Sequence, residues 1–336
     1  MIVGEAWGCE EEDAGGVPFV GASGKLLRGL LRQVGIAYDE AYVTNVFNLR
    51  PHPSNNIINL CGSRGEGIPG YPALSRAKYA KAEYASELDR LFEEIARVNP
   101  TLILALGATP SWALLKTSGI KSIRGAPLPF HLSGHTYKVL PTYHPAAVLR
   151  DWSLRPILLA DLHKARRELE YPDIRRPQRS IWIEPTYTDL IAFECGYINS
   201  SPQLSIDIET EAEQITCIGF APSPSIGLVV PFVDKTKPGN SYWKTLEEEV
   251  RVWQWVRKMC GLKKRIVGQN FLYDIGYLWG KYGIPVPHAT DDTMLLHHSL
   301  QPEMDKGLGF LGSIYTDEAS WKFMGRAKHK TLKTED

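Results

Sequence analysis

The sequence predicts an α/β protein of two domains. The chain has 336 residues, which is more than one hydrophobic core usually organises. Strand and helix patterns alternate along both halves, and such alternation favours sheets flanked by helices. Between the halves, residues 171–180 contain two prolines and three arginines, a composition typical of a linker. We therefore expect a first domain over residues 1–170 and a second over residues 181–336.

Apolar spacing justifies each element of the first half in turn. A short strand opens the chain at residues 2–3, and leucines at helical spacing predict a helix over residues 24–34. The later elements are a strand at 41–47, a helix at 83–98, a strand at 101–106, a short helix around Trp112, a strand at 137–141 and a helix at 156–170. This alternation predicts a three-layer α/β domain with a parallel sheet.

The order of strands and helices starts again after the linker. The second half is expected to hold a strand at 204–209, a hairpin pair at 216–220 and 226–230, a helix at 244–258, a strand at 265–267 and a helix at 270–282. The sequence contains neither an internal repeat nor a low-complexity tract. Both halves are therefore expected to be compact.

The charged residues balance, with 38 Lys and Arg against 38 Asp and Glu. The net charge therefore does not indicate a nucleic-acid partner, and any basic surface that binds nucleic acid must be local. Basic clusters occur in the linker, at residues 263–265 and in the tail, although such clusters are more often solvated surface. The sequence has no run of about 18 apolar residues and no signal-peptide pattern, so we expect a cytoplasmic protein without a membrane partner.

The five cysteines are scattered along the chain. They are Cys9, Cys61, Cys195, Cys217 and Cys260. No two of them have C-x-x-C spacing, which argues against a disulfide framework and against a zinc or iron–sulfur cage.

Two carboxylates lie on one predicted strand of the second half. In residues 204–209 the alternation is strict, so Leu204, Ile206 and Ile208 face one way while Asp207 and Glu209 face the other. Carboxylates this close repel each other unless a cation lies between them, and their oxygens suit Mg²⁺ or Mn²⁺. The alternative for a lone D-x-E is a solvated strand face, which is the more common case.

A second motif strengthens the metal-site interpretation. Residues 266–274 read as a strand that turns into a helix, with Phe271, Ile275 and Leu278 on its core-facing stripe. Asn270 and Asp274, four residues apart, share a neighbouring face of that helix. A third acidic group downstream of a D-x-E strand predicts an acidic centre of Asp207, Glu209 and Asp274.

These motifs, followed by D-T-M-L from Asp292, resemble the proofreading exonuclease of family-A DNA polymerases across roughly residues 200–325. The resemblance implies a ribonuclease-H-like fold of the DEDD class with a two-metal Mg²⁺ or Mn²⁺ site. It places metal-binding, catalytic roles on Asp207, Glu209 and Asp274, and a DNA-end contact on Asn270. It also implies single-stranded 3′ ends of DNA as substrate, a polymerase domain or subunit as partner and a phage-like origin. Asp292 is expected to be structural, at the start of the next helix.

One family motif is missing from the second half. The fourth carboxylate of the family lies in a Tyr-x-x-x-Asp motif, and none follows Met294. The polar tail from Trp321 onward is expected to be the exposed loop that precedes this motif. The chain is therefore expected to be C-terminally incomplete or to lack the final helix. The alternative function is that of a non-catalytic, DNA-binding fragment of a phage DNA polymerase.

Four short segments of the first half follow or end predicted strands or precede the first helix. They are the segments Gly4-Glu5-Ala6-Trp7-Gly8, Pro18-Phe19-Val20-Gly21, Thr44-Asn45-Val46 and Tyr143-His144-Pro145-Ala146-Ala147. In an α/β sheet, loops of this kind gather at one edge, where ligand sites form. Taken singly, each key residue has an ordinary explanation: Phe19 as a core aromatic, Asn45 as a turn former and His144 as a helix cap.

Together the four segments resemble the uracil-DNA glycosylase superfamily, closest to its family 4, over roughly residues 1–168. The resemblance implies that Phe19 stacks on a flipped uracil and that Asn45 reads its edge. It assigns catalytic roles to Glu5, which would activate water, and to His144, which would donate to uracil O2.

Two departures from family 4 stand out in the first half. Trp7 stands where the family has proline, which is expected to alter the pocket floor. The family's cluster cysteines have no counterparts here, so no iron–sulfur cluster is expected.

The two resemblances combine into one functional prediction. We expect a three-layer α/β uracil-DNA-glycosylase-like domain joined to a ribonuclease-H-like exonuclease domain. The expected function is DNA processing in replication and repair, by a metal-dependent 3′–5′ exonuclease and by uracil excision from uracil-containing DNA. If the protein is phage-encoded, it would act in the bacterial host cell.

Overall fold

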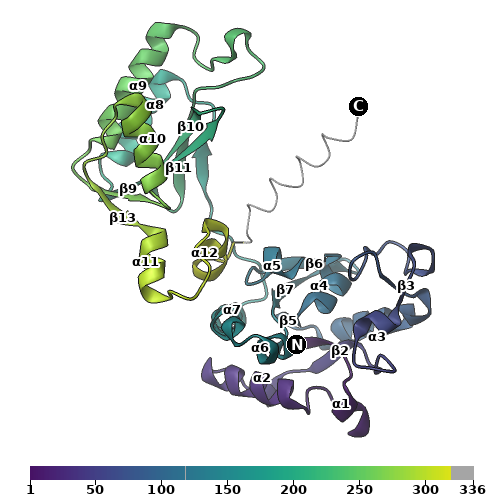
Figure 1. Cartoon of the computed structure of the whole chain (residues 1–336). Helices are drawn as coiled ribbons and strands as arrows, with labels where there is room; N and C mark the ends of the chain where they lie inside the picture. Colours follow the sequence, from purple (N-terminus) through teal and green to yellow (C-terminus); the bar gives the residue numbers. More distant parts are fainter. Residues whose placement is uncertain (118, 319–336) are drawn as a thin grey trace. The chain divides into compact units, whose positions relative to one another are not determined.

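The computed structural model describes residues 1–117 and 119–318 and divides into two compact units (Figure 1). The first unit contains Met1–Arg175 together with the segment that begins at Gly309. The second unit is Arg176–Leu308, so the boundary falls inside the predicted linker at 171–180. The prediction of one domain over residues 181–336 differs from this division, because residues 309–318 belong to the first unit. The tail from Trp321 lies outside the described residues.

The first unit is built on a five-stranded sheet with the order β2-β1-β5-β7-β6. The strands are β1 (Ile2–Ala6), β2 (Val43–Phe47), β5 (Ile103–Leu106), β6 (Leu128–Leu132) and β7 (His135–Thr142). Four of them run parallel, and only the edge strand β6 is antiparallel to its neighbour. This arrangement confirms the predicted α/β class. β1 extends to Ala6, beyond the two residues predicted, and so includes Glu5.

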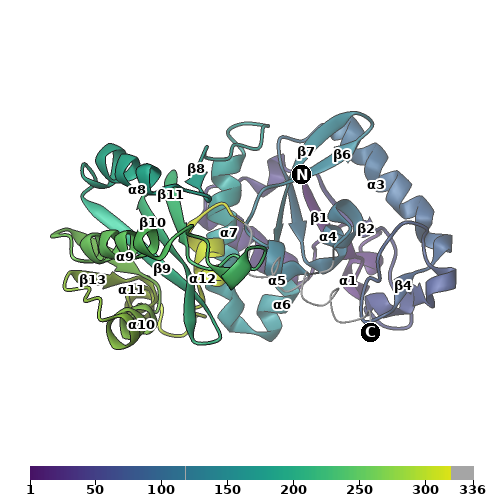
Figure 2. The same cartoon turned by 90° about the horizontal axis from the view of Figure 1, so that it is seen from above.

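Helices cover both faces of this sheet (Figures 1 and 2). The longer ones are α2 (Ala22–Gln33), α3 (Ala85–Val98), α4 (Ala108–Leu115), α6 (Pro145–Arg150) and α7 (Arg155–Glu168). One apolar core joins α2, α6 and α7 to the sheet, and the other joins α3 and α4 to its opposite face. The predicted three layers follow from these two cores.

The remaining elements of the first unit are short and were not predicted. They include α1 (Cys9–Asp13), α5 (Ile120–Ile123), β3 (Cys61–Gly62), β4 (Tyr79–Ala80) and several short 3-10 helices. Elements of two to five residues are too short to display a helical or alternating period, so sequence pattern alone does not mark them.

The second unit is built on a six-stranded sheet with the order β13-β12-β9-β10-β11-β8. Its strands are β8 (Ser180–Trp182), β9 (Gln203–Glu211), β10 (Gln214–Ser223), β11 (Ile226–Pro231), β12 (Arg265–Gly268) and β13 (Ala289–Asp292). The predicted hairpin is present, since β10 pairs antiparallel with β11 and also with β9. β12 runs parallel to β9 but pairs with it only as far as Ser205.

Three helices pack on one face of this sheet and form a single apolar core with it (Figure 1). The helices after the linker are α8 (Tyr187–Phe193), α9 (Leu246–Cys260), α10 (Leu272–Tyr282), α11 (Thr293–Leu300) and α12 (Leu308–Tyr315). The core contains side chains from α8, α9 and α10. No helix within the described ranges is long and apolar enough to cross a membrane.

Candidate functional site

A cavity of about 490 Å³ lies in the first unit, where β1, β2, β5 and β7 end. Strand order reverses at β1, which has β2 on one side and β5 on the other, and ligands of open α/β sheets bind at such points. The cavity is lined by residues from all four predicted segments, among them Glu5, Phe19, Asn45 and His144. The structure therefore brings these four predicted side chains together in one place, which we call the first-unit pocket.

Glu5 stands at the end of β1, with its carboxyl group shielded from solvent. The hydroxyl of Thr109, at the start of α4, donates a hydrogen bond to Glu5 Oε2. Burial raises the pKa of Glu5, while the Thr109 hydrogen bond and the charge of Arg150 oppose that rise. A raised pKa suits a carboxylate that accepts a proton near neutral pH.

His144 caps the N-terminus of α6, and its tautomer is set by that role. The backbone N–H of Ala146 donates to His144 Nδ1 at 3.1 Å. Burial, together with the smaller effect of the Arg150 charge, lowers the pKa of His144 to about 4. The neutral ring therefore carries its proton on Nε2, where it is a hydrogen-bond donor at neutral pH. The helix-cap interpretation and the donor role are thus compatible.

Gly4 and Asn45 face each other across β1 and β2, and Phe19 covers both. A Cβ atom on Gly4 would lie 2.2 Å from Asn45 Oδ1 and 2.7 Å from Phe19 Cζ, so only glycine fits here. Asn45 is 2% exposed, and its Nδ2 has no hydrogen-bond partner among the described residues. A buried amide without a partner is costly, so this N–H₂ group is suited to a ligand.

Phe19 is held in a left-handed backbone conformation, with φ of 59°. Glu11 Oε1 accepts a hydrogen bond from the Phe19 backbone N–H at 2.7 Å, and Arg28 donates to the Phe19 carbonyl at 2.9 Å. The Phe19 ring stacks on the His144 ring with centroids 5.7 Å apart. The two hydrogen bonds, one to the backbone N–H and one to the backbone carbonyl of Phe19, therefore hold its ring beside His144.

Sequence reasoning missed three residues of this site: Glu11, Thr109 and Arg150. A usable signal existed for Thr109, which follows the predicted strand at 101–106 at the sheet edge where the other loops gather. Glu11 and Arg150 gave no signal, because Glu11 binds the backbone of an irregular loop at Phe19 and Arg150 acts through its charge on Glu5 and His144. Trp7 was noted only as a departure, and its Nε1 is a second buried donor without a partner in the described structure.

The acidic pair of the second unit lies as the alternation predicted. Leu204, Ile206 and Ile208 are buried, and Asp207 and Glu209 are exposed on the opposite face of β9. Carboxylates on one open strand face offer oxygen ligands to a divalent cation.

Asp274 reaches β9 from its edge. The strand has no β12 partner beyond Ser205, and the Ile208 N–H donates to Asp274 Oδ1 at 2.8 Å. Burial and, to a smaller extent, the charges of Asp207 and Glu209 raise the pKa of Asp274 to about 6, although the Ile208 hydrogen bond opposes the rise. Within the described ranges, however, no three His, Cys, Asp or Glu side chains are grouped closely enough to hold a metal ion. As placed, the three carboxylates affect each other electrostatically without forming a closed metal site.

Asp292 has the structural role predicted for it. Its carboxylate accepts from the Met294 N–H and so caps α11, and it also accepts from the backbone N–H groups of Asn270 and Phe271. Asn270 is exposed and has a left-handed φ of 52°. Asp292 therefore fixes the turn that carries Asn270 and leads into the helix of Asp274.

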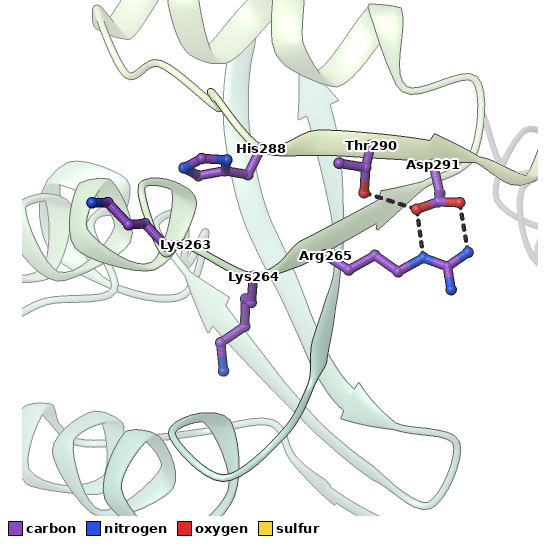
Figure 3. A pocket seen from close by; sticks show the side chains of 6 residues that line it. All are labelled: Lys263, Lys264, Arg265, His288, Thr290 and Asp291. Carbon is purple, nitrogen blue, oxygen red and sulfur yellow. Dashed lines mark hydrogen bonds and ion pairs between the residues drawn. The ribbon is translucent and has the colours of Figure 1, made fainter.

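The basic cluster at residues 263–265 borders an open cavity of about 450 Å³. This cavity is lined by Lys263, Lys264, Arg265, His288, Thr290 and Asp291 (Figure 3). Arg265 donates from Nε and Nη2 to both carboxylate oxygens of Asp291. Lys264 donates to the backbone carbonyls of Ile198 and Ser201. Two of the three cations are thus engaged within the fold, which weakens the case for a phosphate-binding patch.

All five cysteines lie within the described residues and are free thiols. None belongs to a group of three or more His, Cys, Asp or Glu side chains that could hold a metal.

Residues 1–169 match the model of the uracil DNA glycosylase superfamily. A type-4 uracil-DNA glycosylase from Thermotoga maritima is 37% identical over 170 residues, which cover 49% of this chain and 75% of the relative. A type-4 uracil-DNA glycosylase from Pyrobaculum aerophilum is 33% identical over 167 residues, covering 48% of this chain and 74% of that protein.

Among solved structures, a match is the EXD2 exonuclease domain soaked in Mn and GMP. It is 16% identical with a TM-score of 0.26, and the alignment covers 36% of this chain and 59% of that one. A likeness at this level supports no conclusion about the second unit.

Proposed function

The chain belongs to the uracil DNA glycosylase superfamily through residues 1–169, and from this we propose that its first unit excises uracil from DNA. The observation that carries the proposal is the first-unit pocket, where Glu5, Phe19, Asn45 and His144 meet. The unpartnered Asn45 amide is the group that a flipped uracil would satisfy, since an amide pairs with both O4 and N3–H of that base.

In the proposed reaction, the bond between the sugar C1′ and uracil N1 breaks and its electron pair moves into the base. Negative charge then gathers on uracil O2, where the neutral His144 would donate from Nε2. A water molecule attacks C1′ and loses a proton to Glu5, and that proton finally passes to the released uracil. The products are free uracil and an abasic site. Phe19 would stack on the flipped ring and keep it in place.

The proposal is tested with a uracil-containing oligonucleotide in the presence of EDTA. We expect the wild-type chain to produce abasic sites. In Asn45→Ala the excision rate should fall by about 10²–10³-fold, because the polar edge of uracil would lose the amide that binds it. Asn56→Ala is the matched control, because Asn56 caps a short turn outside the pocket. An oligonucleotide left intact by the wild-type chain would refute uracil excision.

We propose, as a second function, that the second unit degrades single-stranded 3′ ends of DNA with Mg²⁺ or Mn²⁺, as proofreading nucleases do. The specific observation in its favour is that Asp207 and Glu209 share one exposed strand face and that Asp274 accepts a hydrogen bond from Ile208, the residue between them. The order of the acidic motifs along the chain supports the same class. DNA processing is the common theme of both units.

Degradation of an end-labelled primer tests this second function. We expect it to require the added metal and to fall by about 10²–10⁴-fold in Asp207→Ala, the usual effect of one catalytic group. Glu211→Ala is the control, because Glu211 lies on the same strand but pairs with Lys235. Uracil excision should be unchanged in both variants. A primer that stays intact with both metals would contradict the nuclease proposal.

A further inference from the structure

Helix α12 follows the second unit in sequence but packs within the first. Arg124 donates from Nη1 to the Ser313 hydroxyl at 2.7 Å. Lys164 donates from Nζ to the Ser313 carbonyl at 2.6 Å and also to the Thr316 carbonyl. Two cations of the first unit are therefore satisfied by a segment that the chain supplies only after residue 308.

The groups that receive α12 are almost fully buried. Arg124, Asp161, Lys164 and Ser313 are each exposed by 2% or less. Asp161 binds the Arg124 guanidinium through both carboxylate oxygens, with 2.9 Å for Nε to Oδ2. A Cβ atom on Gly125 would lie 2.5 Å from Asp161 Oδ1 and 3.0 Å from the Ser313 carbonyl, so this junction has no spare room. Each partner of such a buried charge matters for stability. A buried charge that loses a partner destabilises the fold far more than a solvent-exposed charge does.

The buried junction continues to the strand that carries the proposed catalytic histidine. The Thr142 hydroxyl donates to Asp161 Oδ2 at 2.6 Å. Thr142 is the last residue of β7 and lies two positions before His144. The Arg124 guanidinium also lies 6.0 Å from the ring centroid of Tyr143, which lines the first-unit pocket. A continuous path of contacts therefore runs from Ser313 through Arg124 and Asp161 to the His144 loop.

We propose that α12 is a positioning element of the uracil-excision site, with Ser313 fixing Arg124 and thereby the Thr142–His144 loop. This inference rests on the proposed function of the first unit. Its physical basis is that a hydrogen-bond donor must be aimed to within a fraction of an ångström to stabilise a developing charge. Helix α12, which follows the second unit in the sequence, would thus contribute to catalysis in the first unit.

The test uses the full-length chain with Ser313→Ala, which removes one hydroxyl from the junction. We expect the single-turnover rate of excision to fall by roughly tenfold while the affinity for uracil-containing DNA is unchanged, because a shift of about 1 Å at a catalytic group can cost up to 10²-fold. Ser313→Thr keeps a hydroxyl and should recover most of the rate. Ser299→Ala is the matched control, since that hydroxyl donates to the Leu295 carbonyl within α11.

A second variant probes the other end of the same path. Thr142→Val removes the hydroxyl that donates to Asp161. If the two ends act through one path, the double variant should lose less than the product of the single losses, since linked groups are not additive. The NMR signal of the His144 ring gives a readout that does not depend on turnover, and it should shift in Ser313→Ala but not in Ser299→Ala.

The outcomes separate this inference from the function on which it rests. An active wild type whose rate and His144 signal are both unchanged by Ser313→Ala overturns the positioning role and leaves uracil excision standing. An inactive wild type whose His144 signal still shifts in Ser313→Ala refutes excision but supports the coupling. Equal losses in Ser313→Ala and Ser299→Ala would mean a general loss of stability and would also overturn the inference.

Discussion

Replacing His144 with alanine should reduce the single-turnover rate of uracil excision by about 10²–10³-fold, the usual effect of removing one donor to a developing oxyanion. The reason is that His144 Nδ1 accepts from Ala146, which leaves the Nε2 proton as the donor in the neutral ring. The ring also stacks on Phe19, so the variant is expected to weaken binding of the flipped base to a smaller extent.

The pH dependence of the wild-type rate gives a second measurement of the same geometry. Since the pKa of His144 is lowered to about 4, the ring stays neutral between pH 5 and 8, as its donor role requires. Glu5 must be ionised to accept a proton, and burial raises its pKa above the ordinary 4.5. The rate should therefore fall as the pH drops through this raised pKa, and the acidic limb should disappear in Glu5→Gln.

A suitable control for His144→Ala is His131→Ala on the edge strand β6. His131 is exposed and contacts Thr136, away from the first-unit pocket. Retention of wild-type activity by His144→Ala, with the control equally active, would exclude His144 from the chemistry.

Gly4→Ala is the second substitution with a large expected effect. Its methyl group would come within 2.2 Å of Asn45 Oδ1 and 2.7 Å of Phe19 Cζ, so both recognition groups must move. Overpacking of this kind costs about 1–3 kcal/mol of folding free energy. Displacement of the reading amide and the stacking ring should lower excision by about 10²-fold or more. Thermal melting and single-turnover kinetics measure the two effects separately.

Gly29→Ala provides the matched glycine control. Gly29 lies on the exposed side of α2, and a Cβ atom there meets nothing within 4 Å. Alanine favours helix over glycine by about 1 kcal/mol, so this variant should be slightly more stable and fully active. If Gly4→Ala behaved like Gly29→Ala, the close contact among Gly4, Asn45 and Phe19 would not govern the site.

The gathering of Glu5, Phe19, Asn45 and His144 in one pocket could be expected from the sequence, because three of them lie in or directly after apolar strands. Glu5 is the penultimate residue of β1, Asn45 lies within β2 beside Gly4 of β1, and His144 follows β7, and parallel strands bring their carboxyl ends to one edge. Glu11 was not predicted, because its role is to bind the Phe19 backbone and depends on the path of an irregular loop. Local periodicity carries no information about such loop contacts.

Helix α12 illustrates what a local pattern cannot supply. Its residues have apolar helical character, but Arg124, the partner of Ser313, is 189 residues away. Its position in the sequence suggests that α12 belongs to the second domain, and only its buried contacts with Arg124 and Lys164 place it in the first unit. The cluster at residues 263–265 shows the same limit, since charge alone did not reveal that Arg265 pairs with Asp291.

The return of the chain to the first unit also sets an order during synthesis. Lys138 binds the carbonyls of Glu168 and Tyr171, so the chain leaves the first unit from an anchored point. All of the second unit must then emerge from the ribosome before Ser313 and Thr316 can reach Lys164. The first unit can therefore complete its fold only after the whole second unit has been translated. During that interval, Arg124 lacks its Ser313 partner and Lys164 lacks the Ser313 and Thr316 carbonyls, so the nascent first unit is expected to be the more vulnerable to proteases.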